Sequence, residues 1–227
     1  MRSWRRGYRV RTEFEIVKPM DIEKRSFEII SEELRKMGKI LAPETEMIVK
    51  RCIHTSADFD YADSLVFSEG VTGKALEALR EGTDIVTDTQ MARSGINRRA
   101  AERLGSDVLC FMSDEDVAKR ARELGMTRAA VSMDKAAELS RERGGLIYAI
   151  GNAPTALIRL CEQIRSGLIA PRLVIGVPVG FVNVVQAKEL LLSSDVPYIV
   201  AKGRKGGSSI AACICNALLY MIDNDRS

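Results

Sequence analysis

Aromatic residues are scarce in this 227-residue sequence: phenylalanine, tyrosine and tryptophan together make up 5% of it. Few rings are therefore present to stack on the bases of a nucleic acid, which disfavours a single-strand-binding protein. The net charge of +3 is too small to require a nucleic-acid partner, although it would not repel an anionic small molecule. We expect no nucleic acid among the partners.

Histidine and closely spaced cysteines, which are the usual ligands of zinc, are also nearly absent. His54 is the only histidine, and no C-x-x-C motif occurs. The five cysteines lie within apolar segments and mostly far apart, as expected of buried thiols in a reducing compartment. They are Cys52, Cys110, Cys161, Cys213 and Cys215. We therefore expect no metal site built by the protein.

A long apolar run is missing as well. The longest apolar stretches have the length of a β-strand or are interrupted by polar residues, so neither a signal peptide nor a membrane span is predicted. We expect a cytoplasmic protein with no membrane partner.

The N-terminus is strongly basic, with arginines at positions 2, 5, 6, 9 and 11 before the first acidic residue. We interpret residues 1–18 as a solvated, partly disordered basic arm, with contact to a phosphate or carboxylate as the alternative. No linker or repeat divides the rest of the chain, so residues 19–227 are predicted to form a single α/β domain.

The spacing of apolar residues predicts an α/β fold with an N-terminal helical segment. Helical periodicity extends over residues 21–38, 43–53 and 71–82, with Pro43 in the first turn of the second helix. Five strand-length apolar runs follow, separated by amphipathic stretches. They are 84–88, 107–112, 146–150, 173–178 and 197–203. This alternation predicts a flavodoxin-like, doubly wound parallel sheet of about five strands.

Doubly wound sheets bind ligands at the carboxyl ends of their strands, where this sequence repeatedly places glycine and small polar residues. The segment GRKGGSS (203–209) lacks the G-x-x-x-x-G-K-[ST] pattern of a phosphate loop, but it opens the last helix with Arg204, Gly206, Gly207 and Ser208. It is either an anion cradle or only a tight turn with a helix cap. In GNAPTAL (151–157), Asn152 either contacts a ligand or belongs to simple helix initiation. Several such loops on one edge suggest a large ligand with several negative groups.

His54 is predicted at the end of an apolar helix face. A lone histidine is more often structural than chemical, but Arg51, three residues earlier, would share its face and hold a carboxylate near the imidazole. Apart from the cysteines, no other side chain ordinarily titrates near neutrality, so His54 is the natural proton donor or acceptor. Asp58 and Asp60 either cap helices or lie on the surface, or they orient His54. Serine catalysis is disfavoured because G-x-S-x-G is missing.

Taken together, six segments resemble the precorrin-8X methylmutase family, which includes the cobalt-precorrin-8 methylmutases. In order, they are RSFEII, VKRCIHTSADF, DTQMARSGI, GNAPTAL, GVPVGFV and GRKGGSS. The resemblance extends from about residue 19 to residue 220 and leaves out the arginine-rich start. It implies that His54 is the active-site histidine and that Ser26, in the S-F-x-I-I motif, and Arg51 contact the substrate.

One segment departs from the family pattern. After PVGFV the family commonly has a glutamate and then Ser-Lys, whereas this sequence has Gln186 and Ala187 before Lys188. The carboxylate and hydroxyl are lost, which puts any role of the first two positions in doubt. Lys188 is retained, and we expect it to contact the anionic substrate.

The resemblance implies an isomerase, usually a homodimer, that moves a methyl group from C-11 to C-12 of a corrinoid ring. The product would be hydrogenobyrinate or its cobalt form, cobyrinate. We expect an anionic tetrapyrrole substrate and no cofactor, because a methyl shift within one molecule needs no redox group or methyl donor. Two alternatives are a non-catalytic tetrapyrrole-binding carrier and, from the glycine-rich loops alone, a phosphate-ester or nucleotide enzyme. No residue indicates whether the substrate carries cobalt.

Overall fold

A computed structural model describes Glu15 and residues 18–222 of the chain. The arginine-rich start, and with it nearly all of the predicted arm over residues 1–18, lies outside the described residues. No helix within the described part is long and apolar enough to cross a membrane.

The centre of the structure is a six-stranded sheet in the order β1-β6-β5-β4-β2-β3. Its strands are β1 (Leu65–Phe67), β2 (Ile85–Thr87), β3 (Val108–Leu109), β4 (Ile147–Ile150), β5 (Leu173–Gly176) and β6 (Tyr198–Ala201). The last five strands pair in parallel and follow the flavodoxin-like order, so the predicted parallel sheet is confirmed. β1 was not predicted; it adds an antiparallel edge strand beside β6.

The helices fill the connections between the strands and form the N-terminal segment. They are η1 (Pro19–Asp21), α1 (Ile22–Lys36), α2 (Glu46–Ser56), α3 (Tyr61–Ser64), α4 (Val71–Arg80), α5 (Gln90–Gly95), α6 (Arg98–Arg103), α7 (Glu115–Leu124), α8 (Arg128–Arg143), α9 (Pro154–Arg165), α10 (Val184–Leu192) and α11 (Ser208–Ile222). The predicted helices over 21–38 and 71–82 correspond to α1 and α4. The second helix begins later than expected, because Pro43 lies in a turn in which the Thr45 amide donates to the Ala42 carbonyl.

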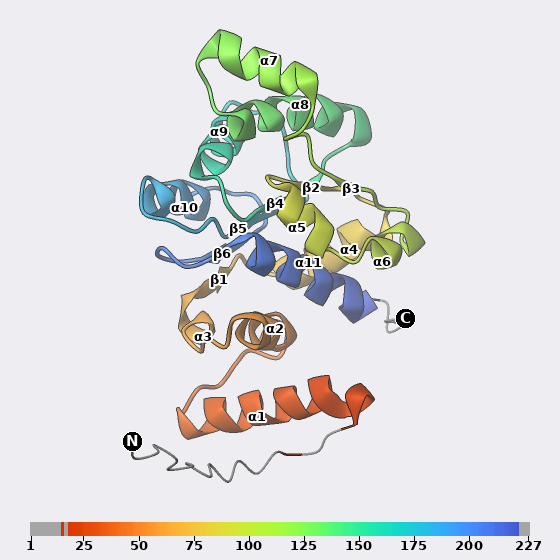
Figure 1. Cartoon of the computed structure of the whole chain (residues 1–227), viewed down its shortest axis with the longest axis vertical. Helices are drawn as coiled ribbons and strands as arrows, with labels where there is room; N and C mark the ends of the chain where they lie inside the picture. Colours follow the sequence, from red (N-terminus) through yellow and green to blue (C-terminus); the bar gives the residue numbers. More distant parts are fainter. Residues whose placement is uncertain (1–14, 16–17, 223–227) are drawn as a thin grey trace, which may run out of the picture.

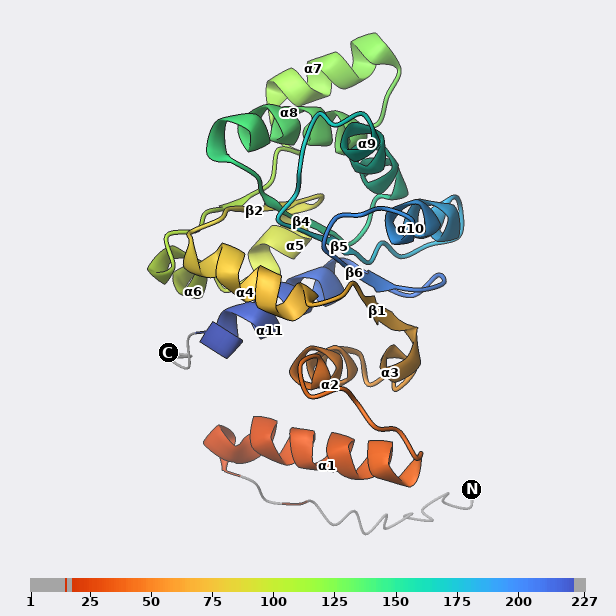
Figure 2. The ribbon, with the colours of Figure 1, turned by 180° about the vertical axis from the view of Figure 1, so that it is seen from behind.

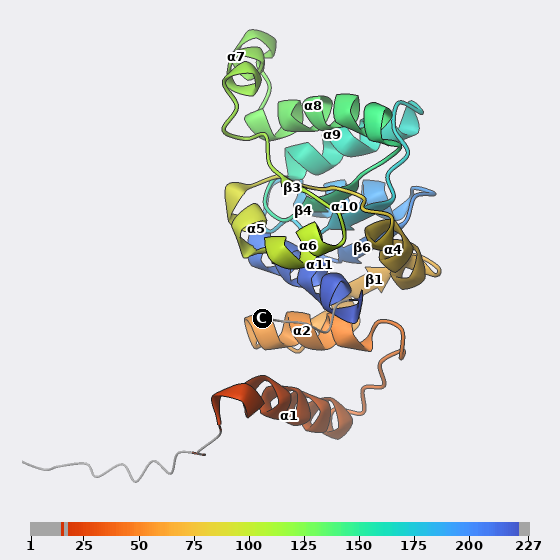
Figure 3. The ribbon, with the colours of Figure 1, turned by 90° about the vertical axis from the view of Figure 1, so that its right-hand side faces the viewer.

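Alternate residues of each strand pack into two separate cores. Tyr148 and Val174 face α8, α9 and α10, whereas Ile147 and Ile175 face the layer that contains α4 and α11. Figure 3 shows these layers above and below the sheet, and Figure 2 shows α4 beside α11 on the same side. Because both faces are covered, the strands are apolar on both sides.

The N-terminal helices form a further layer on the α11 side. α2 packs on α11, and α1 packs on the outer side of α2 (Figure 1). Ile30 and Leu34 of α1 join the same buried cluster as Ile48 and Ile53 of α2. This arrangement carries the histidine-bearing helix to the side of the sheet on which α11 begins.

Candidate functional site

The loops at the carboxyl ends of the parallel strands are packed tightly against one another. The Gly207 amide, at the end of the β6–α11 loop, donates to the Val177 carbonyl after β5 at 2.9 Å. A Cβ atom on Gly206 would lie 2.0 Å from the same carbonyl oxygen, and Gly206 has a φ of +156°. A Cβ on Gly151, after β4, would lie 2.7 Å from the Ser208 Cα. The glycines are therefore needed for close backbone approach, as well as for turning the chain.

Thr89 and Ser208 join the first and last of these loops. Their hydroxyl oxygens lie 2.8 Å apart, and Thr89 also accepts the Ala92 amide as the cap of α5. Gly206, Gly207 and Ser208, which the sequence predicted as a possible anion cradle, are thus held at the start of α11 beside the loop that follows β2.

Asp88 occupies the position at which an anion was expected at the start of α9. Its buried carboxylate accepts the amides of Gly151 at 2.9 Å, Asn152 at 2.8 Å and Ala153 at 2.6 Å. Burial raises the pKa of Asp88, while the three amides act in the opposite direction. The protein itself therefore supplies the anion at this helix start, and only the exposed Asn152 side chain remains to meet a ligand. Asp88 was not predicted as a site residue, although an acid directly after an apolar strand was a signal.

Lys188 lies beneath the β6–α11 loop. Its side chain is buried, and Nζ donates to the carbonyls of Gly203 at 2.8 Å and Lys205 at 2.7 Å. Burial lowers the pKa of Lys188 to about 8. We expected this lysine to contact the substrate; the structure instead places its ammonium against the inner side of the loop.

Lys205 connects the same loop to the segment after α2. Its ammonium forms ion pairs with Asp58 at 2.6 Å and with Asp60 at 2.5 Å. These pairs raise the pKa of Lys205 and lower the pKa of Asp58. Both aspartates are therefore engaged by Lys205 at the surface. This contact was not predicted, because its partners are 147 and 145 residues apart in the sequence.

His54 lies in the last turn of α2, and its side chain is exposed. Its ring packs against Phe27 of α1, with the ring centroids 5.5 Å apart and the planes inclined by 55°. α2 ends at Ser56, and the next residue, Ala57, adopts the left-handed conformation and leads into the Asp58 turn. The imidazole thus packs against an aromatic ring of α1 and is exposed to a ligand, while the next residue, Thr55, contacts Cys213 of α11 at 3.1 Å.

Arg51 lies deeper in the same helix. Its guanidinium is 2.8 Å from Glu23 of α1 and lies over the rings of Phe27 and Tyr220, at 5.4 and 4.8 Å from their centroids. The side chain is buried. The carboxylate that Arg51 holds is thus one of the protein's own, and Arg51 links α1, α2 and α11.

Ser26 and Arg204 belong to different elements, Ser26 to α1 and Arg204 to the β6–α11 loop. Ser26 is half-buried on α1, next to Phe27, and its hydroxyl donates to the Ile22 carbonyl at 2.9 Å. Arg204 is exposed and lies over the Phe181 ring at 5.4 Å from its centroid. Phe181 and Val182 are 82% and 76% exposed, so the β5–α10 loop presents an apolar surface beside a cation. Such a surface suits a flat apolar ring with anionic substituents.

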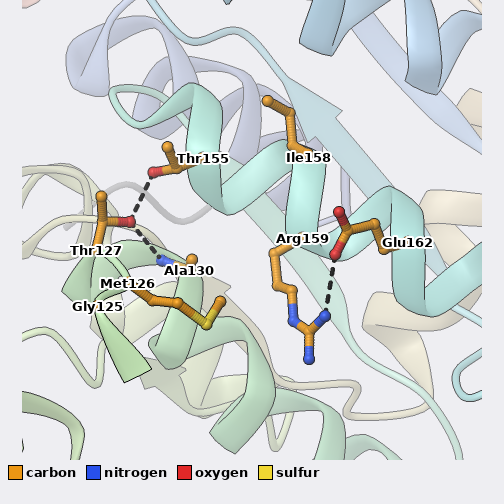
Figure 4. Close-up of a pocket in the computed structure, with 8 residues that line it drawn as sticks. All are labelled: Gly125, Met126, Thr127, Ala130, Thr155, Ile158, Arg159 and Glu162. Carbon is orange, nitrogen blue, oxygen red and sulfur yellow. Dashed lines mark hydrogen bonds and ion pairs between the residues drawn. The ribbon is translucent and has the colours of Figure 1, made fainter. Parts of the chain in front are cut away.

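A separate groove of about 290 Å³ lies between the start of α8 and α9 (Figure 4). Its polar side chains pair with protein groups: the hydroxyls of Thr127 and Thr155 lie 2.8 Å apart, and Arg159 binds Glu162 at 3.0 Å. Arg159 also binds the buried Asp134. Because these polar groups form hydrogen bonds and ion pairs with one another, the groove is a weaker candidate for a ligand site than the surface around His54.

Comparison with known proteins identifies the family. The chain matches the CbiC precorrin-8X methylmutase family from residue 21 to residue 221. A cobalt-precorrin-8 methylmutase of Priestia megaterium is 42% identical over 216 residues, which cover 94% of each chain. One from Salmonella typhimurium is 44% identical and is matched over 96% of its length, by 90% of this chain. A solved structure of the precorrin-8X methylmutase of Thermus thermophilus is 36% identical, with a TM-score of 0.80 over 90% of this chain and 98% of that one. The chain therefore belongs to the precorrin-8X methylmutase family.

Proposed function

We propose that the chain catalyses the migration of a methyl group from C-11 to C-12 of precorrin-8X or cobalt-precorrin-8, which gives hydrogenobyrinate or cobyrinate. One observation carries the proposal: an exposed histidine, His54, lies in the last turn of α2, and the segment that follows α2 is ion-paired with Lys205 of the glycine-rich β6–α11 loop. The chain matches the family from residue 21 to residue 221. The reaction is an isomerisation within cobalamin biosynthesis.

In this proposal His54 is the general acid. Its imidazolium gives a proton to the conjugated ring system, which draws electron density toward the carbon that receives the methyl group. The imidazole takes a proton back after migration, so the product remains an isomer of the substrate. General acid catalysis typically contributes about 10²–10⁴-fold, and positioning of the ring supplies the remaining acceleration.

The substrate carries acetate and propionate groups around an apolar macrocycle, and the surface near His54 is suited to both parts. Arg204 offers an exposed cation, while Gly206, Gly207 and Ser208 lead into the N-terminus of α11, where amides favour anions. Ser26 is proposed to contact the substrate from α1, and Asn152 from the β4–α9 loop. Arg51 contributes to binding by fixing α1 against α2, because its guanidinium is engaged with Glu23.

We further propose that the protein is a homodimer and acts in the cytoplasm. The side chains of Ile22 at the start of α1 and of Met37 directly after its end are 53% and 50% exposed and are available for a subunit contact. The five unpaired cysteines suit a reducing compartment. Light scattering after size-exclusion chromatography measures the mass directly, and a monomer at micromolar concentration would contradict the dimer.

Incubation with precorrin-8X and, separately, with cobalt-precorrin-8 tests the function. The expected result is conversion of at least one substrate into its corrin product, seen as a change in the absorption spectrum and as an unchanged mass. A substrate spectrum that persists while the ligand stays bound would instead indicate a carrier. The same pair of assays reveals whether the enzyme prefers the metal-free or the cobalt-containing ring.

A further inference from the structure

The first observation concerns the charge state and the partners of Lys188. The lysine projects from α10 and is 1% exposed, and its ammonium donates to two backbone carbonyls, those of Gly203 and Lys205. Within Glu15 and residues 18–222, no carboxylate forms an ion pair with it. Burying an ammonium without a counter-charge is unfavourable, so a methionine of similar length would suit the site better if the lysine served only to fill space.

The two hydrogen bonds of Lys188 fix the backbone of the β6–α11 loop. By turning the carbonyls of Gly203 and Lys205 inward, Lys188 fixes the backbone on both sides of Arg204. The Arg204 side chain then points outward and lies over Phe181. The Gly207 amide completes the attachment by donating to Val177. The Arg204 carbonyl also accepts the Gly180 amide at 3.2 Å. The backbone of the loop is thus attached at four points, two of which depend on the Lys188 side chain.

The β6–α11 loop is also linked to the helix that carries His54. The side chain of Lys205, whose carbonyl Lys188 holds, forms the ion pairs with Asp58 and Asp60. These aspartates follow α2, which carries His54 in its last turn. A displacement of the loop backbone at Lys205 would therefore also displace, or release, the end of α2.

We propose that Lys188 is a positioning residue that acts through the β6–α11 loop and does not touch the substrate. It sets the direction of Arg204, and through Lys205 it sets the position of the His54-bearing end of α2. The effect on turnover rests on the proposed function, whereas the effect on the loop does not.

Hydrogen exchange of the free protein tests the loop without reference to activity. In Lys188→Met, the Gly207 amide, which donates to Val177, should exchange at least about tenfold faster, while the amides of β4 and β5 stay as in the wild type. Lys119→Met is the matched control, because Lys119 lies on α7 with a 74% exposed side chain and its carboxylate partner is 3.9 Å away. Lys188→Arg keeps the donors and should restore part of the protection.

Two exchange results would overturn the proposal. One is an unchanged loop in Lys188→Met combined with weaker product binding, which would make Lys188 a direct ligand contact. The other is faster exchange throughout the chain in both Lys188→Met and Lys188→Arg, which would make Lys188 a general structural residue.

Kinetics of the same variants supply the second readout. Loss of position should raise KM and lower kcat in Lys188→Met, each by about tenfold, whereas a smaller folded fraction would lower kcat alone. Lys205→Met should change both constants in the same direction. The double variant should be no worse than Lys188→Met, because both changes act on one loop; additive losses would contradict the proposed route. If the wild type converts neither substrate, the proposed function fails, and the exchange result still decides the role of Lys188.

Discussion

The carboxylate of Asp88 binds the backbone amide of Asn152 at 2.8 Å, so an internal anion fills the start of α9 at the point where the strand order reverses. In doubly wound folds this crevice commonly receives a ligand. Here the amides of Gly151 and Ala153 are engaged by the same carboxylate. The open part of the edge therefore lies nearer β5, β6 and α2.

Asp88→Asn should destabilise the fold by about 3 kcal/mol, since hydrogen bonds to a charged acceptor contribute about 1.5–3 kcal/mol each and do not add fully. The NH2 group of the asparagine side chain is also a donor, and it would face backbone amides that need an acceptor. Urea unfolding measures the change, with the exposed Asp195→Asn as the control. An unfolding free energy equal to that of the wild type would show that these three bonds contribute little.

His54→Ala should reduce turnover at least about 10²-fold, because alanine offers no proton donor at this position. Binding of the coloured product should change little, since the exposed imidazole supplies one contact among many. Single-turnover absorption and product titration separate the two effects. Turnover close to that of the wild type would remove the histidine from the reaction.

Ser26→Ala can be compared with a closely matched serine on the same helix. Ser26 and Ser31 are both half-buried and both donate to a carbonyl four residues earlier, at 2.9 and 2.6 Å. Their alanine variants should therefore have similar stability. Only Ser26→Ala should raise KM, because the proposed function places it at the substrate. Equal KM values for the two variants would argue against that contact.

The buried Lys188 should give a pH-dependent contribution to stability. Its pKa falls from 10.5 to about 8 on folding, so below pH 8 both states are charged and the folded state carries the full cost of burial. Between pH 8 and 10.5 the unfolded state holds a proton that the folded state has released. The unfolding free energy of the wild type should therefore rise with pH relative to that of Lys188→Met, by up to about 3 kcal/mol.

Urea unfolding of the two proteins at several pH values between 7 and 10.5 measures this difference. Comparing them at each pH removes the titration of the tyrosines and cysteines, which both proteins share. A difference that stays constant across this range would mean that the lysine has its ordinary pKa in the folded protein.

Two glycines in one loop provide a paired test of close packing. Gly203 and Gly206 both have a positive φ, at +76° and +156°, but a Cβ on Gly203 meets nothing within 4 Å, whereas one on Gly206 would meet the Val177 carbonyl. Gly203→Ala should cost about 1 kcal/mol from backbone strain alone. Gly206→Ala should cost clearly more and weaken product binding. Thermal unfolding and product titration check both statements. An equal loss of stability in the two variants would mean that the loop shifts easily to make room for a Cβ atom.

The parallel sheet was predictable because its strands are continuous apolar runs between amphipathic helices. β1 was missed because three residues at an edge give too little pattern to distinguish a strand from a loop, and its partner β6 is more than 130 residues away. The start of α2 was misplaced because Pro43 is equally suited to a turn and to a first helical turn.

For the site, the sequence located the loops and His54 but not how they are bonded. Whether an amide at a helix start is free for a ligand depends on side chains brought in from elsewhere, as Asp88 is to Asn152 across 64 residues. The direction of Lys188 was also beyond prediction, because a lysine on an amphipathic helix normally reaches solvent.

The position of α1 has a consequence for the space beside the imidazole. This helix carries Ser26 and Phe27, yet it is held chiefly by α2 and stands apart from the sheet (Figure 1). One side of the imidazole's surroundings is therefore set by a single helix–helix contact, which the Arg51–Glu23 ion pair holds. A substitution in that contact would alter the space beside the imidazole and leave the strands and their loops in place.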